Sequence, residues 1–379
     1  MKRVVLSPKV AAARKVAVLG AGSWGTTFAK ILADAGNDVT IWARREELAN
    51  DINQTRRNSD YLRGITLPAN MVATNSMATA LRGAEQVYFC VPAQSLREVL
   101  IDAASFISND TIVVSLMKGV EKKTGLRMSE VIAEELMIDP DNIAVVSGPN
   151  LALEIAKEQP TAAVASSTTL ETAEAVAIAC SNDYFHCFVN TDVAGTEFGG
   201  VLKNLIAVAV GIVDGVGYGD NTKASIITRG LAEITDFAVA YGAEPGTLAG
   251  LAGLGDLIAT CESPLSRNNT AGRLLGQGYT LTEVIKQMSQ TAEGLASVAP
   301  ILSLARAREV DMPIVEQVSQ VLAGTLDPRD LAPHLTDTDE PVGERTSDGS
   351  QTRGRGALWG SLKRALDQLR DGSGSASGD

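Results

Sequence analysis

Residues 20–25 (GAGSWG) match the pattern G-x-G-x-x-G in the setting that gives this pattern meaning. The apolar run Val16–Leu19 precedes them and a helical stretch follows, so the pattern lies at a strand–turn–helix junction. There Gly20 would permit the tight turn, Gly22 would let a pyrophosphate approach the backbone, and Gly25 would allow close helix–strand contact. The first N–H groups of the helix favour phosphate. The junction predicts a dinucleotide site; the alternative is a glycine-rich turn without a ligand.

Two arginines, Arg44 and Arg45, follow the second apolar run, Val39–Ala43. Sites selective for NAD usually place Asp or Glu at this point, where the carboxylate bonds the ribose 2′-hydroxyl. A guanidinium instead grips a 2′-phosphate through paired hydrogen bonds. The sequence therefore predicts that NADP(H) is accepted and preferred, with NAD(H) also usable. The alternative is that both are surface arginines after a strand.

Lys203 is the one charged residue in the apolar stretch Phe198–Val213, where it stands beside Asn204. A helix this apolar is buried on most sides. Burial disfavours the charged form of an amine and lowers its pKa, which suits a general acid/base. Hydride transfer beside a nicotinamide needs a group that moves the hydroxyl proton. With only two histidines in the chain, Lys203 is the best candidate, unless it extends to solvent or pairs structurally.

Two later segments hold polar side chains suited to a small anionic substrate. Asp256 lies in the small-residue, apolar stretch Leu251–Leu257, and its carboxylate is a candidate partner for the Lys203 ammonium. Residues 266–269 (SRNN) combine hydrogen-bond donors with one guanidinium, a set suited to a phosphate. The alternatives are a helix cap or turn for Asp256 and a solvated loop for Arg267.

Short apolar runs rich in β-branched residues alternate with helical stretches in the first half of the chain, which predicts a doubly wound, mostly parallel, Rossmann-like sheet. Ligands bind such sheets beyond the carboxyl ends of the strands. Lys118 follows a run at once and should project there; the alternative is an ordinary surface lysine. Gly148 and Asn150 follow the next run. The expected strands are Val16–Leu19, Val39–Ala43, Val87–Val91, Ile112–Leu116, Ala144–Ser147, Ala162–Ala165 and Phe185–Val189.

Strand signals stop after Asn190, and the composition changes again after residue 334. We expect an extension over 1–14, a dinucleotide-binding domain over 15–190 and an all-helical substrate and catalytic domain over 191–334. Residues 335–379 are expected to form a disordered, acidic, Gly/Ser-rich tail, because their composition cannot bury enough apolar surface. Within it, Leu358, Leu362, Leu366 and Leu369 recur at the spacing of a short amphipathic helix.

Composition excludes several classes of protein. Thirty-three Lys and Arg against 45 Asp and Glu give a net charge of −12, which argues against a nucleic-acid binder. The sequence lacks an uncharged apolar run of the length that spans a membrane, and its N-terminus does not resemble a secretory signal. Four scattered cysteines and two histidines indicate neither a disulfide framework nor a metal site. We expect a cytoplasmic protein.

These segments together resemble the bacterial NAD(P)-dependent glycerol-3-phosphate dehydrogenases, from about Lys15 to about Leu331. The resemblance implies reversible reduction of dihydroxyacetone phosphate by NAD(P)H to sn-glycerol 3-phosphate, which supplies glycerophospholipid synthesis. It also implies a homodimer. The segments that carry it are GAGSWGT at Gly20, VP at Val91, KG at Lys118, SGPNLA at Ser147, GTEFGGVLKNLIA at Gly195, TRGLAEI at Thr228, LAGLGDLIATC at Leu251, SPLSRN at Ser263 and AEG at Ala292.

The resemblance also implies roles for single residues. Lys203 matches the proton acceptor for alcohol oxidation and Asp256 the aspartate of the substrate pocket. Asn150 stands where many members carry Ser or Thr, and Thr291 replaces a commonly apolar residue. The remaining substrate positions are Lys118, Gly148, Asn150, Ser266, Arg267 and Asn268. The matching cofactor contacts are Ser23, Trp24, Arg44, Arg45, Tyr61, Lys118, Ala152, Arg267, Thr291 and Glu293.

Two other functions compete with this interpretation. Lysine-dependent dehydrogenases of the β-hydroxyacid or phosphogluconate type share a Rossmann domain, a helical second domain and a helix with Lys and Asn. They lack the Ser-Arg-Asn loop after a Gly-x-Gly-Asp turn. The presence of this loop here favours the resemblance to the glycerol-3-phosphate dehydrogenases. A non-catalytic NADPH-binding sensor is the second rival, and the presence of both Lys203 and Asp256 argues against it.

Overall fold

The computed structural model describes residues 13–288 and 292–331. Three expectations lie outside these residues: the extension up to residue 12, the cofactor contact at Thr291 and the tail over 335–379. The described residues of the sheet and of the helical part belong to one compact unit.

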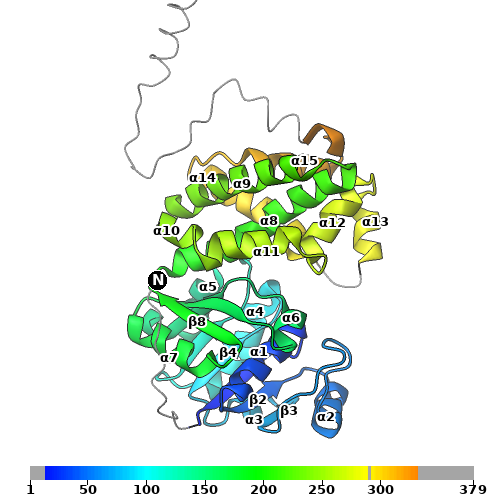
Figure 1. Cartoon of the computed structure of the whole chain (residues 1–379). Coiled ribbons are helices and arrows are strands. Elements are labelled where there is room, and N and C mark those ends of the chain that lie inside the picture. Colours follow the sequence, from blue (N-terminus) through cyan, green and yellow to red (C-terminus); the bar gives the residue numbers. More distant parts are fainter. Residues whose placement is uncertain (1–12, 289–291, 332–379) are drawn as a thin grey trace, which may run out of the picture. The chain divides into compact units, whose positions relative to one another are not determined.

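An eight-stranded sheet forms the first half of the described chain (Figure 1). The strand order is β3-β2-β1-β4-β5-β6-β7-β8, and neighbours run parallel except for β6 and β7. The prediction of a Rossmann-like, mostly parallel sheet followed by helices is therefore confirmed. The strands are β1 (Lys15–Leu19), β2 (Asp38–Trp42), β3 (Met71–Thr74), β4 (Gln86–Phe89), β5 (Ile112–Ser115), β6 (Ile143–Ser147), β7 (Thr161–Ser167) and β8 (Phe185–Asn190).

Strand β3 was not among the expected strands, and its edge position explains why. It pairs only with β2 in the sheet order, and its Val72 is 52% exposed while Met71 is buried. An edge strand with one solvent-exposed face lacks the continuous apolar run by which central strands are recognised. The reversed direction of β7 was likewise absent from the expectation, because an apolar run does not encode its own direction.

Helices cover both faces of this sheet. In β4 the adjacent residues Tyr88 and Phe89 are both fully buried, although neighbours in a strand point to opposite faces. They belong to two different apolar clusters, so each face has its own core. The helices of this half are α1 (Ser23–Asp34), α2 (Glu46–Thr55), α3 (Met77–Leu81), α4 (Leu96–Ala103), α5 (Met128–Leu136), α6 (Ala152–Ala156) and α7 (Leu170–Cys180).

Helix α8 (Val193–Val216) is the core of the helical half. Among the described residues it is the helix long and apolar enough to cross a membrane, but 83% of its apolar window is buried inside the protein. Its sequence therefore reflects burial among other helices. Those helices are α9 (Asp220–Ala240), α10 (Pro245–Leu248), α11 (Asp256–Glu262), α12 (Arg267–Gly276), α13 (Leu281–Gln287), α14 (Glu293–Ala307) and α15 (Pro313–Ala323).

Glycines bring α8 and α12 into backbone contact. A Cβ atom on Gly211 of α8 would lie 2.2 Å from the carbonyl oxygen of Asn269, and one on Gly272 of α12 would lie 2.2 Å from that of Val208. Gly215 and Gly276 repeat the arrangement one turn later. This contact stabilises α12, whose sequence contains two asparagines and two glycines. Glycine and asparagine are weak helix formers, and tertiary packing supplies most helical stability in proteins.

Replacing Gly272 with alanine should destabilise the fold by about 1–3 kcal/mol, because the new methyl group overlaps the backbone of α8. Helix propensity alone would favour alanine by about 1 kcal/mol, so the sign of the effect is diagnostic. The measurement is the free energy of unfolding in urea. Gly246→Ala in α10 is the matched control, since a Cβ atom there meets no atom within 4 Å. Equal free energies for the two variants would contradict the packing argument.

Candidate active site

The glycine loop has the geometry of a phosphate cradle. Gly20 has φ +121°, and a Cβ atom on it would lie 2.2 Å from the Cys90 carbonyl oxygen, so the turn excludes other residues. A Cβ atom on Gly25 would lie 1.9 Å from the Gly20 carbonyl oxygen, whereas one on Gly22 would meet nothing within 4 Å. Helix α1 begins directly after Gly22 without a side-chain cap, which leaves its first N–H groups for a ligand. These residues fit a dinucleotide pyrophosphate.

The side chains expected at the far end of the cofactor gather around this loop. The Ser23 hydroxyl donates a hydrogen bond to the carbonyl oxygen of Tyr61 over 2.7 Å. The Arg45 guanidinium lies 5.9 Å from the centre of the Tyr61 ring and forms an ion pair with Asp60 at 2.5 Å. Arg44 is exposed at the end of β2. A segment 38 residues further along the chain thus joins the loop, which short-range patterns do not reveal.

Two further predicted cofactor residues contact α1. The Trp24 ring packs edge-on against Phe28 with centroids 5.4 Å apart. Ala152 is the first residue of α6, and its carbonyl oxygen accepts a hydrogen bond from Thr27 over 3.3 Å. The start of α6 is therefore held beside the helix that begins at the glycine loop.

A buried carboxylate joins two lysines in the candidate active site. Asp256 is 1% exposed and Lys203 6% exposed, and the Lys203 Nζ lies 2.7 Å from Asp256 Oδ1. The Lys118 Nζ lies 2.6 Å from the other oxygen, Oδ2, and 2.9 Å from the carbonyl oxygen of Gly148. The expected pairing of Asp256 with Lys203 is therefore confirmed. Its second pairing, with Lys118, was not expected.

Thr260 is a member of this group that sequence reasoning missed. Its Oγ1 lies 2.5 Å from the Lys203 Nζ. The signal was present in the spacing, because residues four apart on a helix share a face and Asp256 begins α11. Together Asp256 and Thr260 fix the direction in which the Lys203 ammonium points.

Burial lowers the pKa of Lys203 to about 8. Desolvation is the largest cause, since the charged amine loses its water. The Asp256 carboxylate opposes this effect by attracting the proton, and the positive charge of Lys118 reinforces it. The amine therefore exchanges its proton near neutral pH, where an ordinary lysine stays charged.

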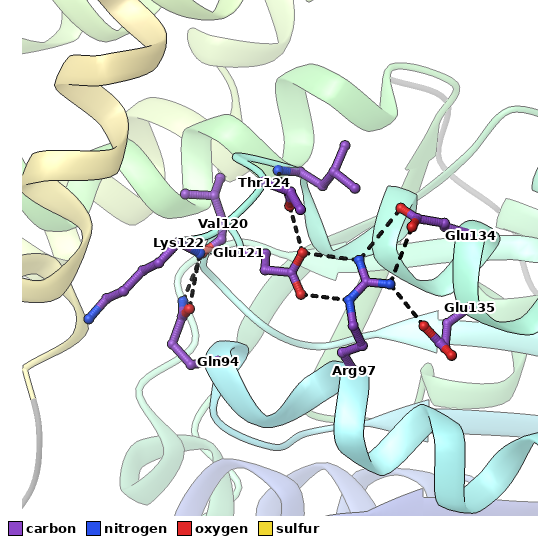
Figure 2. Close-up of polar contacts among 9 residues, drawn as sticks. Gln94, Arg97, Val120, Glu121, Lys122, Thr124, Glu134 and Glu135 are labelled. Atoms are coloured by element: carbon purple, nitrogen blue, oxygen red, sulfur yellow. Dashed lines mark hydrogen bonds and ion pairs between the residues drawn. The ribbon is translucent and has the colours of Figure 1, made fainter.

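The loop that begins at Lys118 is fixed by α4 and the turn before it (Figure 2). Gln94 forms hydrogen bonds with two backbone groups of the loop, of 2.8 and 3.0 Å. Arg97 donates hydrogen bonds to both carboxylate oxygens of Glu121 over 2.8 and 3.0 Å. These contacts lower the pKa of the Glu121 carboxyl below its usual value. Arg97 also reaches Glu134 and Glu135 of α5. These contacts set the place from which Lys118 extends.

The far end of the same loop is tied to α8. Arg127 Nη1 lies 2.9 Å from Oε2 of Glu197, a buried carboxylate in the second turn of that helix. The backbone N–H of Ser129 donates to Glu197 Oε1 over 2.9 Å. Burial raises the pKa of Glu197 and the Arg127 charge opposes the rise. The loop thus connects the sheet to the helix that carries Lys203.

The start of α12 provides the cationic side of the site. Ser266 caps the helix by accepting a hydrogen bond from the Asn269 N–H over 3.2 Å, and the exposed Arg267 is its first residue. Asn268 donates to the side-chain oxygen of Asn204 and accepts from the Gly294 N–H, both over 2.9 Å. Its amide therefore links α12 to α8 and α14.

Glu293, the first residue of α14, lies among the positive charges of the site. Burial raises its pKa, while Arg267, Lys118 and Lys203 each act in the opposite direction. The predicted residues Lys118, Lys203, Asp256, Arg267 and Glu293 are thus electrostatically coupled, although they come from five different segments.

Two of the residues with unpaired buried polar atoms, Ser147 and Asn150, lie at the carboxyl end of β6. In the part of the chain that the structure describes, the Ser147 hydroxyl and both amide atoms of Asn150 are buried without a hydrogen-bond partner. Buried polar groups nearly always have one, so a bound polar molecule or water is needed to satisfy them. A Cβ atom on Gly200 would lie 2.8 Å from Ser147 Oγ and 3.3 Å from Lys118 Cγ, which places the start of α8 beside them. Sequence reasoning missed Ser147, although it ends β6 just before Gly148.

A Rossmann-like sheet with a glycine cradle, completed by a helical half with a buried lysine, defines a dinucleotide-dependent oxidoreductase. Residues 15–173 match the model of the NAD-dependent glycerol-3-phosphate dehydrogenase N-terminus, and residues 192–333 match that of the C-terminus. The chain belongs to the NAD-dependent glycerol-3-phosphate dehydrogenase family.

Individual relatives agree with this family. A glycerol-3-phosphate dehydrogenase [NAD(P)+] of Leifsonia xyli subsp. xyli is 71% identical over 367 residues, which cover 96% of this chain and all of the relative. That of Streptomyces griseus is 56% identical over 308 residues, covering 81% and 92%. The crystal structure of glycerol-3-phosphate dehydrogenase from Coxiella burnetii aligns with a TM-score of 0.81 at 33% identity, covering 86% of this chain and 99% of that one.

Proposed function

We propose that this protein catalyses the reversible reduction of dihydroxyacetone phosphate by NAD(P)H to sn-glycerol 3-phosphate. The observation that carries the proposal is the ion-paired group formed by Lys203, Asp256 and Lys118 beside unpaired polar atoms. The named activity of its relatives supports the choice of substrate. We further propose that the protein works as a cytoplasmic homodimer and supplies glycerophospholipid synthesis.

Residues 15–190 would hold the cofactor and residues 191–334 the catalytic lysine and the substrate phosphate. The glycine loop would hold the pyrophosphate, with Trp24, Ala152 and Glu293 nearby. Arg44 and Arg45 would bind a 2′-phosphate, which favours NADPH over NADH. Ser23 and Tyr61 shape the same end of the site. When bound, the nicotinamide supplies the hydride that reduces the ketone carbon.

Lys203 moves the proton that balances this hydride. As an ammonium it donates a proton to the ketone oxygen while that oxygen becomes a hydroxyl, and it offsets the negative charge that develops there. Asp256 and Thr260 hold its Nζ in one direction, and Lys118 adds positive potential. In the reverse reaction the neutral amine accepts the hydroxyl proton.

The remaining polar groups would bind and orient the substrate. Arg267, with Ser266 and Asn268 at the start of α12, would bind the phosphate, because a guanidinium matches phosphate oxygens. Gly148 and Asn150 would contact the three-carbon part, where the free Asn150 amide needs a partner. When the phosphate is bound, the ketone is held in one position and orientation for reaction.

The pH dependence tests the role of Asp256. Ketone reduction requires protonated Lys203, so its kcat should fall as pH rises through about 8, and alcohol oxidation should rise. Asp256→Asn removes the charge that favours the ammonium, so the midpoint of the falling limb should move to lower pH. The measurement is kcat for reduction against pH. Glu262→Gln, the same change at an exposed position of α11, should leave the midpoint in place. An unmoved or raised midpoint in Asp256→Asn would contradict the assignment.

The reaction itself is tested by following NADPH absorbance after addition of dihydroxyacetone phosphate. We expect rapid oxidation of NADPH with this substrate and little with unphosphorylated dihydroxyacetone. Phosphorylated ketones and 2-keto acids of similar size complete the panel. Preference for a keto acid would overturn the substrate assignment, and cofactor binding without turnover on any ketone would favour a sensor.

A further inference from the structure

The Arg45 guanidinium already has an anionic partner. Asp60 Oδ2 lies 2.5 Å from Arg45 Nη2, and the two side chains are about equally exposed, at 52% and 50%. Asp60 is not one of the expected cofactor or substrate residues. It lies on the loop between α2 and β3, residues 56–70.

This loop is anchored against the cofactor cradle. Asn58 is fully buried and donates hydrogen bonds to the Ala21 carbonyl oxygen over 2.9 Å and to Thr26 Oγ1 over 2.8 Å. Its own side-chain oxygen accepts from the Tyr61 N–H, and the Tyr61 carbonyl accepts from Ser23. Asp60 therefore lies between two residues that are bound to the loop or helix at the pyrophosphate position, which gives its carboxylate a set location beside Arg45.

We propose that Asp60 is a specificity-determining residue that weakens the binding of 2′-phosphorylated cofactor and leaves cofactor with a free 2′-hydroxyl unaffected. This inference rests on the proposed function, in which Arg44 and Arg45 bind the 2′-phosphate. Asp60 makes the site tolerant of both cofactors by reducing the advantage that the two arginines confer.

The physical reason is competition for one guanidinium. A 2′-phosphate that binds Arg45 has to share the guanidinium with Asp60, and the Asp60 carboxylate repels the phosphate. A 2′-hydroxyl carries no charge, so the Asp60 carboxylate does not repel it. Because the pair is half exposed, water and salt weaken both effects, so they are modest.

The test is the variant Asp60→Asn, which keeps the size of the side chain and removes its charge. We expect the Kd for NADPH to fall about two- to fivefold, the range of an exposed ion pair, and the Kd for NADH to stay the same. The change should shrink in high salt. Glu47→Gln removes the same charge from the exposed first turn of α2 and should leave the ratio of the two Kd values unchanged.

A double-mutant cycle with Arg45→Ser separates the two assignments. Arg45→Ser alone should weaken NADPH binding, and adding Asp60→Asn should then tighten it less than in the wild type. If Arg45→Ser weakens NADPH binding but Asp60→Asn leaves the Kd ratio unchanged, the role of Asp60 is wrong. If Arg45→Ser leaves NADPH binding unchanged, the assignment of this arginine to the 2′-phosphate is wrong and the inference falls with it.

Discussion

Lys203→Ala should reduce kcat for dihydroxyacetone phosphate by about 10²- to 10⁴-fold, the range typical for loss of a general acid. Lys203 is the more deeply buried of the two amines that the structure places at the Asp256 carboxylate, and burial lowers its pKa to about 8. Binding of NADPH, measured by fluorescence, should persist, because the glycine loop belongs to the sheet. The variant should also fold, since Asp256 keeps the Lys118 ammonium at 2.6 Å and is not left as an unpaired buried charge.

Lys157→Ala is the matched control for this prediction, because it removes an exposed lysine at the end of α6. Its kcat should equal that of the wild type. Lys203→Met, which refills the space with an apolar chain, should be as inactive as Lys203→Ala if the proton is the cause. Turnover of either Lys203 variant within tenfold of wild type would show that another group moves the proton.

Arg267→Ala should raise KM for dihydroxyacetone phosphate about 10- to 100-fold with a smaller change in kcat. The size follows from hydrogen bonds to a charged group, which contribute roughly 1.5–3 kcal/mol. The measurement is steady-state kinetics with saturating NADPH. The loss should disappear for unphosphorylated dihydroxyacetone, whose kcat/KM is expected to match that of the wild type.

Arg273→Ala tests whether the effect belongs to the position. Arg273 lies in the last turn of the same helix, where its Nε is 3.6 Å from Asp214. Removing it changes the protein charge equally but leaves the start of α12 intact, so KM should hardly move. An unchanged KM in Arg267→Ala, or an equal rise in both variants, would contradict the phosphate assignment.

The features that could be predicted from the sequence are those that depend on residues close together along the chain. The glycine loop shows itself by its spacing between a strand and a helix, and Gly20 has the conformation that the motif requires. Lys203 stands out as the one charge in the apolar stretch Phe198–Val213, and burial of that stretch follows from its composition. The buried strands β1, β4 and β5 were likewise visible because both of their faces are apolar.

What escaped prediction depends on contacts between distant segments. Asp256 could be matched to Lys203 as an isolated acid and an isolated base, but its second partner Lys118 is 138 residues away. Asp60 carries no pattern of its own and becomes notable only because its loop folds back onto the glycine cradle. Helix α12 forms against its own weak propensity, because four glycines let two backbones touch. Such features are set by tertiary packing, which a local window does not contain.

Because Asp256 pairs with amines from both halves of the protein, turnover should report on how well the two halves are packed together. Lys118 follows a strand of the sheet, whereas Lys203 and Asp256 lie on helices α8 and α11, so this ion-paired group is complete only when the two halves of the protein are packed together. A denaturant concentration that weakens the contact between the two halves should abolish turnover while nucleotide binding is still measurable. Either half produced alone should be inactive. Mixing the two fragments should restore the reaction only to the extent that they associate.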